Sequence, residues 1–227
     1  MGSKQESKRS AYTDTNIIHS HFQKYAKIYW EYLQAILIAI VLALLVRAFI
    51  IQAFKIPSGS MLETLQIGDH ILVNKFIFHF TEPKRGDIIV FKFPGDKKKD
   101  YIKRLIGVPG DRLEIKNQQI YINNVLLDEP LVEEYAEHKG IRTDIPQRDD
   151  FGPMIIPEKC YFMMGDNRDR SSDSRFWGLL KRELIEGKAF IIYWSWDKDK
   201  DFFNWSWKKG ERYFGRIRLS RLFKLLH

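Results

Sequence analysis

The chain has 227 residues, of which 44% are hydrophobic and 29% are charged, and its formal net charge at pH 7 is +8. This hydrophobic content supports a packed core and excludes a globally disordered chain. The single cysteine, Cys160, excludes an intrachain disulfide and a multi-cysteine metal site, and the six histidines show no HExxH or similar spacing. The sequence therefore gives no support for a metal site or a cofactor.

The N-terminal part of the chain predicts a membrane anchor. Residues 1–31 are polar and carry more Lys and Arg than acidic residues, and residues 32–54 form the one long apolar segment, interrupted by Arg47. A helix of about 20 apolar residues spans a bilayer, and an arginine near one end can extend to the headgroups. Trp30 and Tyr32 suit the interface. The positive-inside rule predicts a cytoplasmic tail, with the rest of the chain across the membrane.

A cleaved signal peptide and a buried core helix are two other interpretations of the apolar segment. A cleaved signal peptide needs an apolar core followed by a small-x-small site, and the sequence Arg47-Ala48-Phe49 provides none. A buried core helix would have a polar face, and none is marked over residues 36–46. The pattern favours an uncleaved anchor.

The stretch Pro57-Ser58-Gly59-Ser60 follows the apolar segment directly. Proline fixes one backbone torsion and glycine permits torsions that are closed to other residues, so the stretch predicts a shaped loop that presents a hydroxyl group. A serine becomes a good nucleophile only when a base removes its proton. Taken alone, the stretch is more typical of an ordinary turn.

From residue 68 onward the pattern is that of short β-strands separated by Pro, Gly and Asp. Residues 128–153 are charged and contain glycine and proline, which predicts a loop-rich excursion, and a short helix is expected near residues 181–186. No alternation of strands and helices is present, so the fold class is mainly β. The strand-like runs are residues 71–73, 87–93, 101–106, 112–115, 119–122, 125–127, 161–164 and 189–194.

Lys103, within the strand-like run 101–106, is the candidate base for Ser60. A buried lysine must be paired or neutral, and burial can lower the pKa of its amine by about three units from about 10.4. The other interpretation is a lysine on the outer face of an amphipathic strand. His70, His79 and His138 lie at turn or loop positions with no acidic residue evident nearby to orient them.

A third stretch, Gly165 to Gly178, is dense in turn-forming residues, hydroxyl groups and paired charges. A solvated loop or a calcium loop would also have this composition. The acidic residues at 166, 169 and 173 lack the spacing and the terminal glutamate of an EF-hand. Arginines placed among the acidic residues indicate ion pairs that hold the loop in one shape.

Together these stretches resemble the motifs of bacterial type I signal peptidases, the Ser/Lys leader peptidases. The match runs from about Phe54 to Gly178, in the order and spacing of that family, and its five ordered stretches make a chance match very improbable. The matching stretches are residues 57–61, 65–76, 85–91, 101–111 and 165–178.

The resemblance implies a role for each matching residue. Ser60 would be the nucleophile and Lys103 the general base, and the Ser60 backbone N–H with the Ser58 hydroxyl would form the oxyanion hole. Ser171 would hydrogen-bond and orient the Lys103 amine. Three residues would support the site: Asp173, Ser174 and Arg175. The shallow substrate pockets would be lined by Phe54, Ile56, Pro57, Met61, Leu65, Ile71, Val90, Tyr101 and Ile102.

The resemblance also implies an organisation and a function. It implies a signal-peptidase-like catalytic β domain at residues 55–227, with a core at about 55–111 and 158–227 and an accessory insertion at about 112–157. The enzyme would be a membrane-bound serine endopeptidase, without a cofactor, that removes signal peptides after Ala-x-Ala type sites. It would be a single-pass protein of the cell inner membrane with its catalytic domain on the extracytoplasmic side. Its partners would be signal peptides of exported preproteins and membrane lipid, near the secretion translocon, and not nucleic acid.

Three other functions are alternatives to the removal of signal peptides from exported preproteins. A self-cleaving Ser/Lys repressor would share the chemistry, but the chain has an anchor and shows no N-terminal DNA-binding unit. Signal-peptide processing in an organelle would look similar. A non-enzymatic membrane-tethered β module that binds peptide or lipid would need none of Ser58, Ser60, Lys103 or Ser171. Many members of the family have two anchors, whereas one is evident here.

The C-terminal part is aromatic and basic. Four tryptophans lie between residues 194 and 207, and from Lys208 to His227 seven cationic residues accompany one acidic residue. Such a segment suits a membrane interface, and lipid is a better partner for it than nucleic acid. The aromatic residues could equally close the β core.

Overall fold

The computed structural model describes Tyr25 and residues 27–45, 51–62, 64–128, 150–200, 205–208 and 211–226, with the backbone alone for 205–208 and 211–213. The chain divides into two compact units, Met1–Phe49 and Ile50–His227. Most of the expected N-terminal tail and most of the expected loop at 128–153 lie outside the described residues.

The first unit contains one long helix, Lys27–Leu45, which has 19 residues and is exposed along its length. By length and composition it is able to cross a membrane. At 1.5 Å per residue it is about 28 Å long, close to the hydrocarbon thickness of a bilayer. We expected the anchor at residues 32–54, but Ile51–Phe54 lie in the first strand. Their backbone groups pair with residues 71–74, and a short, mostly apolar run of this kind suits a strand as well as a helix.

The second unit is built almost entirely of strands and short helical turns, which confirms the mainly β class. Its strands are β1 (Ile51–Lys55), β2 (Asp69–Asn74), β3 (Ile88–Phe93), β4 (Asp96–Gly107), β5 (Arg112–Lys116), β6 (Gln119–Ile122), β7 (Val125–Leu126), β8 (Phe151–Ile155), β9 (Cys160–Met164), β10 (Leu180–Lys181), β11 (Ile185–Ser195), β12 (Trp205–Lys208), β13 (Glu211–Phe214), β14 (Ile217–Arg218) and β15 (Lys224–Leu225). The helical turns are η1 (Ile77–His79), η3 (Arg168–Arg170), α3 (Ser174–Trp177), η4 (Arg182–Leu184) and η5 (Leu219–Arg221).

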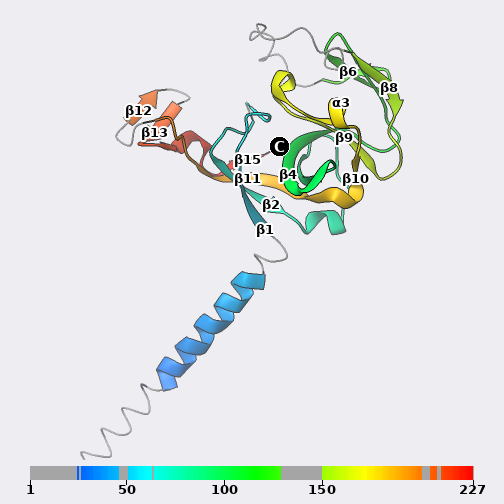
Figure 1. Cartoon of the computed structure of the whole chain (residues 1–227). Coiled ribbons are helices and arrows are strands. Elements are labelled where there is room, and N and C mark those ends of the chain that lie inside the picture. The colour runs from blue at the N-terminus through cyan, green and yellow to red at the C-terminus, as the bar shows by residue number, and fades with distance from the viewer. Residues whose placement is uncertain are drawn as a thin grey trace, which may run out of the picture. The chain divides into compact units, whose positions relative to one another are not determined.

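The strands of the described residues form three antiparallel sheets. The largest has the order β1-β2-β11-β3-β4-β9-β10, with β15 beside β11 (Figure 1). A four-stranded sheet has the order β7-β6-β5-β8, and a three-stranded sheet has the order β12-β13-β14. In the described part of the chain β1 is an edge strand, and β4 lies between β3 and β9.

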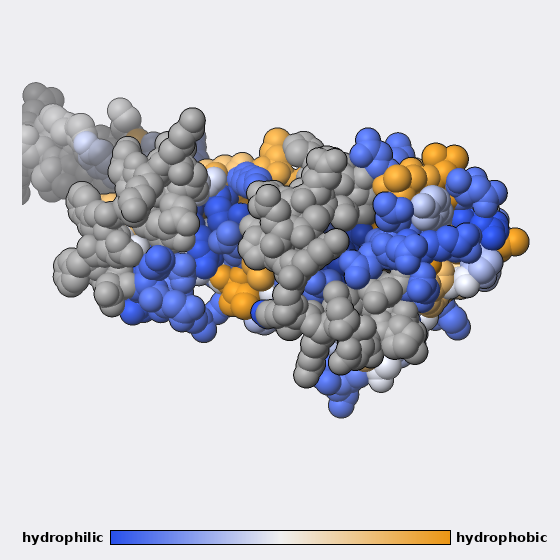
Figure 2. All heavy atoms as spheres, turned by 90° about the horizontal axis from the view of Figure 1, so that it is seen from above, coloured by the Kyte–Doolittle hydropathy of each residue, from blue (hydrophilic) through white to orange (hydrophobic). Residues whose placement is uncertain are grey.

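Three groups of buried apolar side chains form the core. The first fills the space between β2, β3, β11 and the turn after β1, and includes Met61, Leu65 and Ile71. The second packs around Phe91 on β3. The third lies under the four-stranded sheet and includes Phe162. On the face shown in Figure 2, hydrophobic residues form separate small patches among hydrophilic ones.

Two local expectations differ from the structure. Residues 128–153 were expected to be loop-rich because they are charged and contain glycine and proline, yet Phe151–Ile155 form β8 and pair with β5. Strand β8 lies at the edge of its sheet, where a proline that lacks an N–H is tolerated. The helix expected near 181–186 is only the single turn η4.

Candidate active site

Ser60 lies on the loop that joins β1 to β2. The Ile56 N–H donates to the Asp69 carbonyl oxygen at 2.9 Å, and the Gly68 N–H donates to the Ile56 carbonyl oxygen at 3.0 Å. These backbone bonds close the base of the loop. Ser58 is exposed and Ser60 is half-buried.

The Lys103 side chain meets the Ser60 hydroxyl. Lys103 lies on β4, is only 3% exposed, and donates from Nζ to Ser60 Oγ at 2.6 Å. The two residues are 43 positions apart in the chain. The structure therefore brings together the residues predicted to be the nucleophile and the base.

Burial lowers the pKa of the Lys103 amine from 10.5 to about 8. Removal of the ammonium group from water disfavours its charged form. The Asp173 and Asp166 carboxylates act in the opposite direction and raise the pKa, while the Arg175 guanidinium lowers it. With a pKa of about 8, roughly a tenth of the amine is neutral at pH 7, which is in the range that suits a general base.

Asn167 binds the backbone carbonyl oxygens of Ser60 and of the residue before it. Its side-chain Nδ2 donates to the Gly59 carbonyl oxygen at 3.0 Å, and its backbone N–H donates to the Ser60 carbonyl oxygen at 3.1 Å. The stretch 165–178 is therefore in direct contact with the serine loop. Sequence reasoning did not single out this residue, although it lies in the stretch that we did identify.

Gly165 separates the serine loop from Ser171. A Cβ atom at position 165 would lie 2.6 Å from Ser171 Cβ and in overlap with both Ser171 Oγ and the Ser60 carbonyl oxygen. Only glycine fits between these groups. The Ser171 hydroxyl is buried and has no hydrogen-bond partner among the described residues. The hydrogen bond that we expected from Ser171 to Lys103 is therefore not formed here, and the hydrogen bond of the Lys103 amine goes to Ser60.

Asp173, Ser174 and Arg175 fix the shape of the segment that follows β9. The Arg175 guanidinium makes a two-pronged ion pair with the Asp173 carboxylate, at 2.8 and 2.9 Å, and both side chains are buried. Asp173 also accepts from the Gly165 N–H at 3.1 Å, and Ser174 Oγ accepts from the Met163 N–H at 2.9 Å. The ion pair expected from the sequence is present, and it also holds the backbone of Gly165.

A second buried ion pair, which the sequence did not predict, lies beside Lys103. Arg104 Nε and Nη2 each donate to the Asp166 carboxylate at 2.8 Å. Thr64 Oγ1 donates to the same carboxylate at 2.6 Å, and Arg104 Nη1 donates to the Gly86 carbonyl oxygen at 2.8 Å. The pair thus links β4, the serine loop and the segment after β9.

Comparison with known proteins places the chain in a family. The family model described as signal peptidase, peptidase S26, matches residues 29–194. The chain belongs to the signal peptidase family. A signal peptidase I of Pseudomonas aeruginosa is 36% identical over 214 residues, covering 75% of this chain and 74% of that protein. A signal peptidase I of Bacillus licheniformis is 40% identical over 174 residues, covering 74% of this chain and 90% of that protein.

A solved structure of a signal peptidase I from Enterococcus faecalis V583 is 35% identical and covers 48% of this chain and 97% of that one. Its TM-score is 0.41.

In this member of the signal peptidase family, most of the residues expected to line substrate pockets are packed together beside Ser60. Met61, Leu65 and Ile71 are 0% exposed, while Phe54 and Ile102 are partly buried against them. Ile56 and Val90 belong to the same group, Tyr101 packs against the second core group, and Pro57 is exposed. The contact of these residues with substrate stays a prediction.

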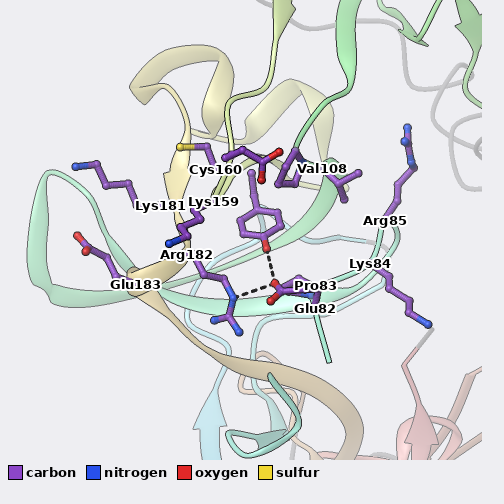
Figure 3. Close-up of a pocket in the computed structure, with 13 residues that line it drawn as sticks. Glu82, Pro83, Lys84, Arg85, Val108, Lys159, Cys160, Lys181, Arg182 and Glu183 are labelled. Carbon is purple, nitrogen blue, oxygen red and sulfur yellow. Dashed lines mark hydrogen bonds and ion pairs between the residues drawn. The ribbon is translucent and has the colours of Figure 1, made fainter. Parts of the chain in front are cut away.

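A cavity of about 1220 Å³ in the described part of this signal peptidase does not include Ser60 or Lys103 among its lining residues. It lies between the segments 82–85, 108–109, 158–161 and 181–183. Figure 3 shows Arg182 directed toward Glu82, which also accepts a hydrogen bond from the Tyr161 hydroxyl at 3.0 Å. Burial raises the pKa of Tyr161 to about 12. Cys160, which is unpaired, lines this cavity.

Proposed function

We propose that this chain is a membrane-bound serine endopeptidase that cleaves signal peptides from exported preproteins with a Ser60 nucleophile and a Lys103 general base. The observation that carries the proposal is the 2.6 Å contact between Lys103 Nζ and Ser60 Oγ, made by a buried lysine whose pKa is lowered to about 8. Membership of the signal peptidase family supports the substrate class.

The reaction follows from this contact. The neutral Lys103 amine accepts the Ser60 proton as Ser60 Oγ attacks the scissile carbonyl carbon. The tetrahedral intermediate then collapses, and the lysine ammonium returns the proton to the departing amine, which leaves an acyl-enzyme ester. Water, deprotonated by the same amine, hydrolyses the ester and frees Ser60.

The developing oxyanion would be stabilised by the Ser60 backbone N–H and the Ser58 hydroxyl. Ser58 is exposed and lies two residues before the nucleophile on the same closed loop. One such donor contributes about a hundredfold to a thousandfold to turnover. We therefore expect Ser58→Ala to lower turnover by that factor and to leave the fold intact.

The substrate would bind as an added β-strand along β1. This strand is an edge of the large sheet in the described residues, so one side of its backbone is open for pairing. It leads directly into the serine loop, which would place the scissile bond near Ser60. Phe54 and Ile102, which are only partly buried against the apolar core around Met61 and Leu65, would form a wall that excludes large side chains and favours Ala-x-Ala type sites.

The helix Lys27–Leu45 would hold the enzyme in the membrane as a single-pass anchor with a cytoplasmic N-terminus. Lipid and the secretion translocon are then its expected surroundings in the inner membrane. Resistance of the full chain to alkaline extraction, together with protection of the N-terminus from protease added outside the cytoplasm, would support this topology. Release into the soluble fraction at alkaline pH would contradict it.

The decisive experiment compares the full chain in detergent or lipid with its Ser60→Ala and Lys103→Arg variants on a preprotein with an Ala-x-Ala site. Arginine stays protonated, so both variants should be almost inactive while remaining folded. Equal cleavage by Ser60→Ala would remove Ser60 as the nucleophile. Cleavage by none of the three folded proteins would favour the alternative, a membrane-tethered module that binds peptide or lipid.

A further inference from the structure

The turn η5, near the C-terminus, contacts the serine loop. Arg221 on η5 donates from Nη2 to the Thr64 carbonyl oxygen at 2.7 Å and to the Asp69 carboxylate at 2.6 Å. Its Nε donates to the same carboxylate at 3.1 Å. One guanidinium therefore joins the backbone four residues after Ser60 to the first residue of β2. The contacts connect positions 152 and 157 residues apart in the chain.

Asp69 is the centre of this contact and is 0% exposed. Its carboxylate also accepts from the Gln66 N–H at 2.8 Å and from the Ser195 hydroxyl at 2.6 Å. A carboxylate buried this deeply needs a cation and several donors to offset its lost hydration. Arg221 is that cation, and the same group that neutralises Asp69 also binds the serine loop.

A second arginine binds the next part of the loop. Arg218 Nη1 donates to the Ile67 carbonyl oxygen at 3.0 Å and lies 3.8 Å from the Asp69 carboxylate. The Trp196 N–H donates to the Gly68 carbonyl oxygen at 3.1 Å. Three backbone carbonyl oxygens of residues 64–69, those of Thr64, Ile67 and Gly68, thus accept hydrogen bonds from residues nearer the C-terminus.

We infer that Arg221 is a positioning residue for the reaction, one that holds the Ser60 loop in register with Lys103 by binding Thr64 and Asp69 at once. The inference rests on the proposed role of Ser60. Asp69 transmits the constraint, because its backbone oxygen accepts from Ile56, the residue at the other end of the loop. The family-model match ends at residue 194, so the arginine lies outside the matched segment.

The fork of the guanidinium is essential to this role. Its separate N–H groups bind a carbonyl oxygen and a carboxylate simultaneously, whereas a lysine ammonium is a compact point charge. Arg221→Lys keeps the charge beside Asp69 but cannot reproduce the fork. Turnover by Arg221→Lys should therefore fall by about tenfold, and by Arg221→Met by about a hundredfold, with KM nearly unchanged.

The test measures kcat, KM and thermal unfolding of the full chain in detergent for both variants, at a temperature where each remains folded. Arg216→Met is the matched control, because it removes the same charge from the same segment while Arg216 Nε binds only the Lys200 carbonyl oxygen among the contacts described. The control should keep wild-type kcat. Ser60→Ala is assayed in parallel, so that a wrong nucleophile is recognised separately from a wrong positioning residue.

A purely structural role for Arg221 predicts a lower unfolding temperature with wild-type kcat for the folded enzyme, and that result would overturn the inference. So would full recovery of kcat by Arg221→Lys, because charge alone would then suffice. The double variant Asp69→Asn with Arg221→Met provides a further check. Its kcat should be close to that of Arg221→Met alone, because both substitutions break the same contact between Arg221 and Asp69.

Discussion

Arg104 and Asp166 form a buried, two-pronged ion pair at the residue next to Lys103, with both nitrogen–oxygen distances at 2.8 Å. The Asp166 carboxylate therefore has two effects at the site. It holds the segment after β9 against β4 and, through Thr64, against the serine loop. It also raises the pKa of Lys103, in opposition to the larger effect of burial. The position of Ser60 relative to Lys103 and the pKa of Lys103 thus both depend on the Asp166 carboxylate.

Asp166→Asn is expected to shift the pH–rate profile toward lower pH. Loss of the negative charge removes an influence that raises the pKa of Lys103, so the apparent pKa of kcat should fall below about 8. The kcat on the plateau of the profile should also fall by about tenfold to a hundredfold, because the Asp166 carboxylate no longer joins the segment after β9 to β4 and to the serine loop. The profile is measured from about pH 6 to pH 10.

Asp100→Asn is the control for this prediction. Asp100 is an exposed residue of β4, and its carboxylate forms an ion pair with Lys92 on β3. The profile of this variant should match that of the wild type. An unchanged or raised apparent pKa in Asp166→Asn would show that the carboxylate does not act on the base.

Lys103→Met is expected to abolish activity and to stabilise the fold at neutral pH. The pKa of Lys103 is about 8 in the folded protein and 10.5 without burial, so the folded state binds fewer protons between these values. The resulting penalty on folding is complete below pH 8 and is relieved as pH rises toward 10.5. Replacement by methionine should therefore add about 1–3 kcal/mol to the unfolding free energy at pH 7.

This gain should shrink as the pH of a chemical-denaturation series is raised toward about 10. Lys188→Met serves as the comparison, because it removes a lysine that is ion-paired with Asp87 at 2.6 Å. That variant should lose stability. Equal destabilisation by Lys103→Met at pH 7 would mean that the Lys103 ammonium is not disfavoured by burial.

The reacting residues could be predicted from sequence because their motifs have fixed order and spacing. Ser60 and Lys103 are found within hydrogen-bond distance, as the motifs implied. The contacts that hold them could not be predicted. Arg104 and Asp166 are 62 residues apart, and nothing in the local pattern pairs one arginine with one acid among many.

The errors in the fold have similar causes. The mostly apolar run 51–54, which includes Gln52, fits either a helix or a strand, and only its pairing with β2 decides between them. Gly152 and Pro153 usually mark a loop, but the edge position of β8 makes them compatible with a strand. Strand β2 was recognised because its apolar run at residues 71–73 is a local pattern that is typical of a strand.

Asn167→Asp should lower turnover by about tenfold to a hundredfold without unfolding the protein. The substitution keeps size and shape but replaces the donor that binds the Gly59 carbonyl oxygen with an acceptor that repels it. The measurement is kcat with thermal unfolding as the check on folding. Asn124→Asp is the matched control, since Asn124 uses its oxygen to accept from Arg112 and an aspartate can do the same. Equal kcat in both variants would contradict a role for Asn167 in holding the serine loop.

Gly165→Ala should reduce turnover by at least about a hundredfold, because the new methyl group overlaps the Ser60 carbonyl oxygen and Ser171. The carbonyl belongs to the backbone of the nucleophile, so relief of the overlap moves Ser60 away from Lys103. Gly110→Ala is the control: there a methyl group meets nothing within 4 Å, and only the positive φ of 86° makes it unfavourable. That variant should lose stability but keep the turnover of the folded enzyme. Wild-type turnover in Gly165→Ala would show that the serine loop tolerates displacement at this contact.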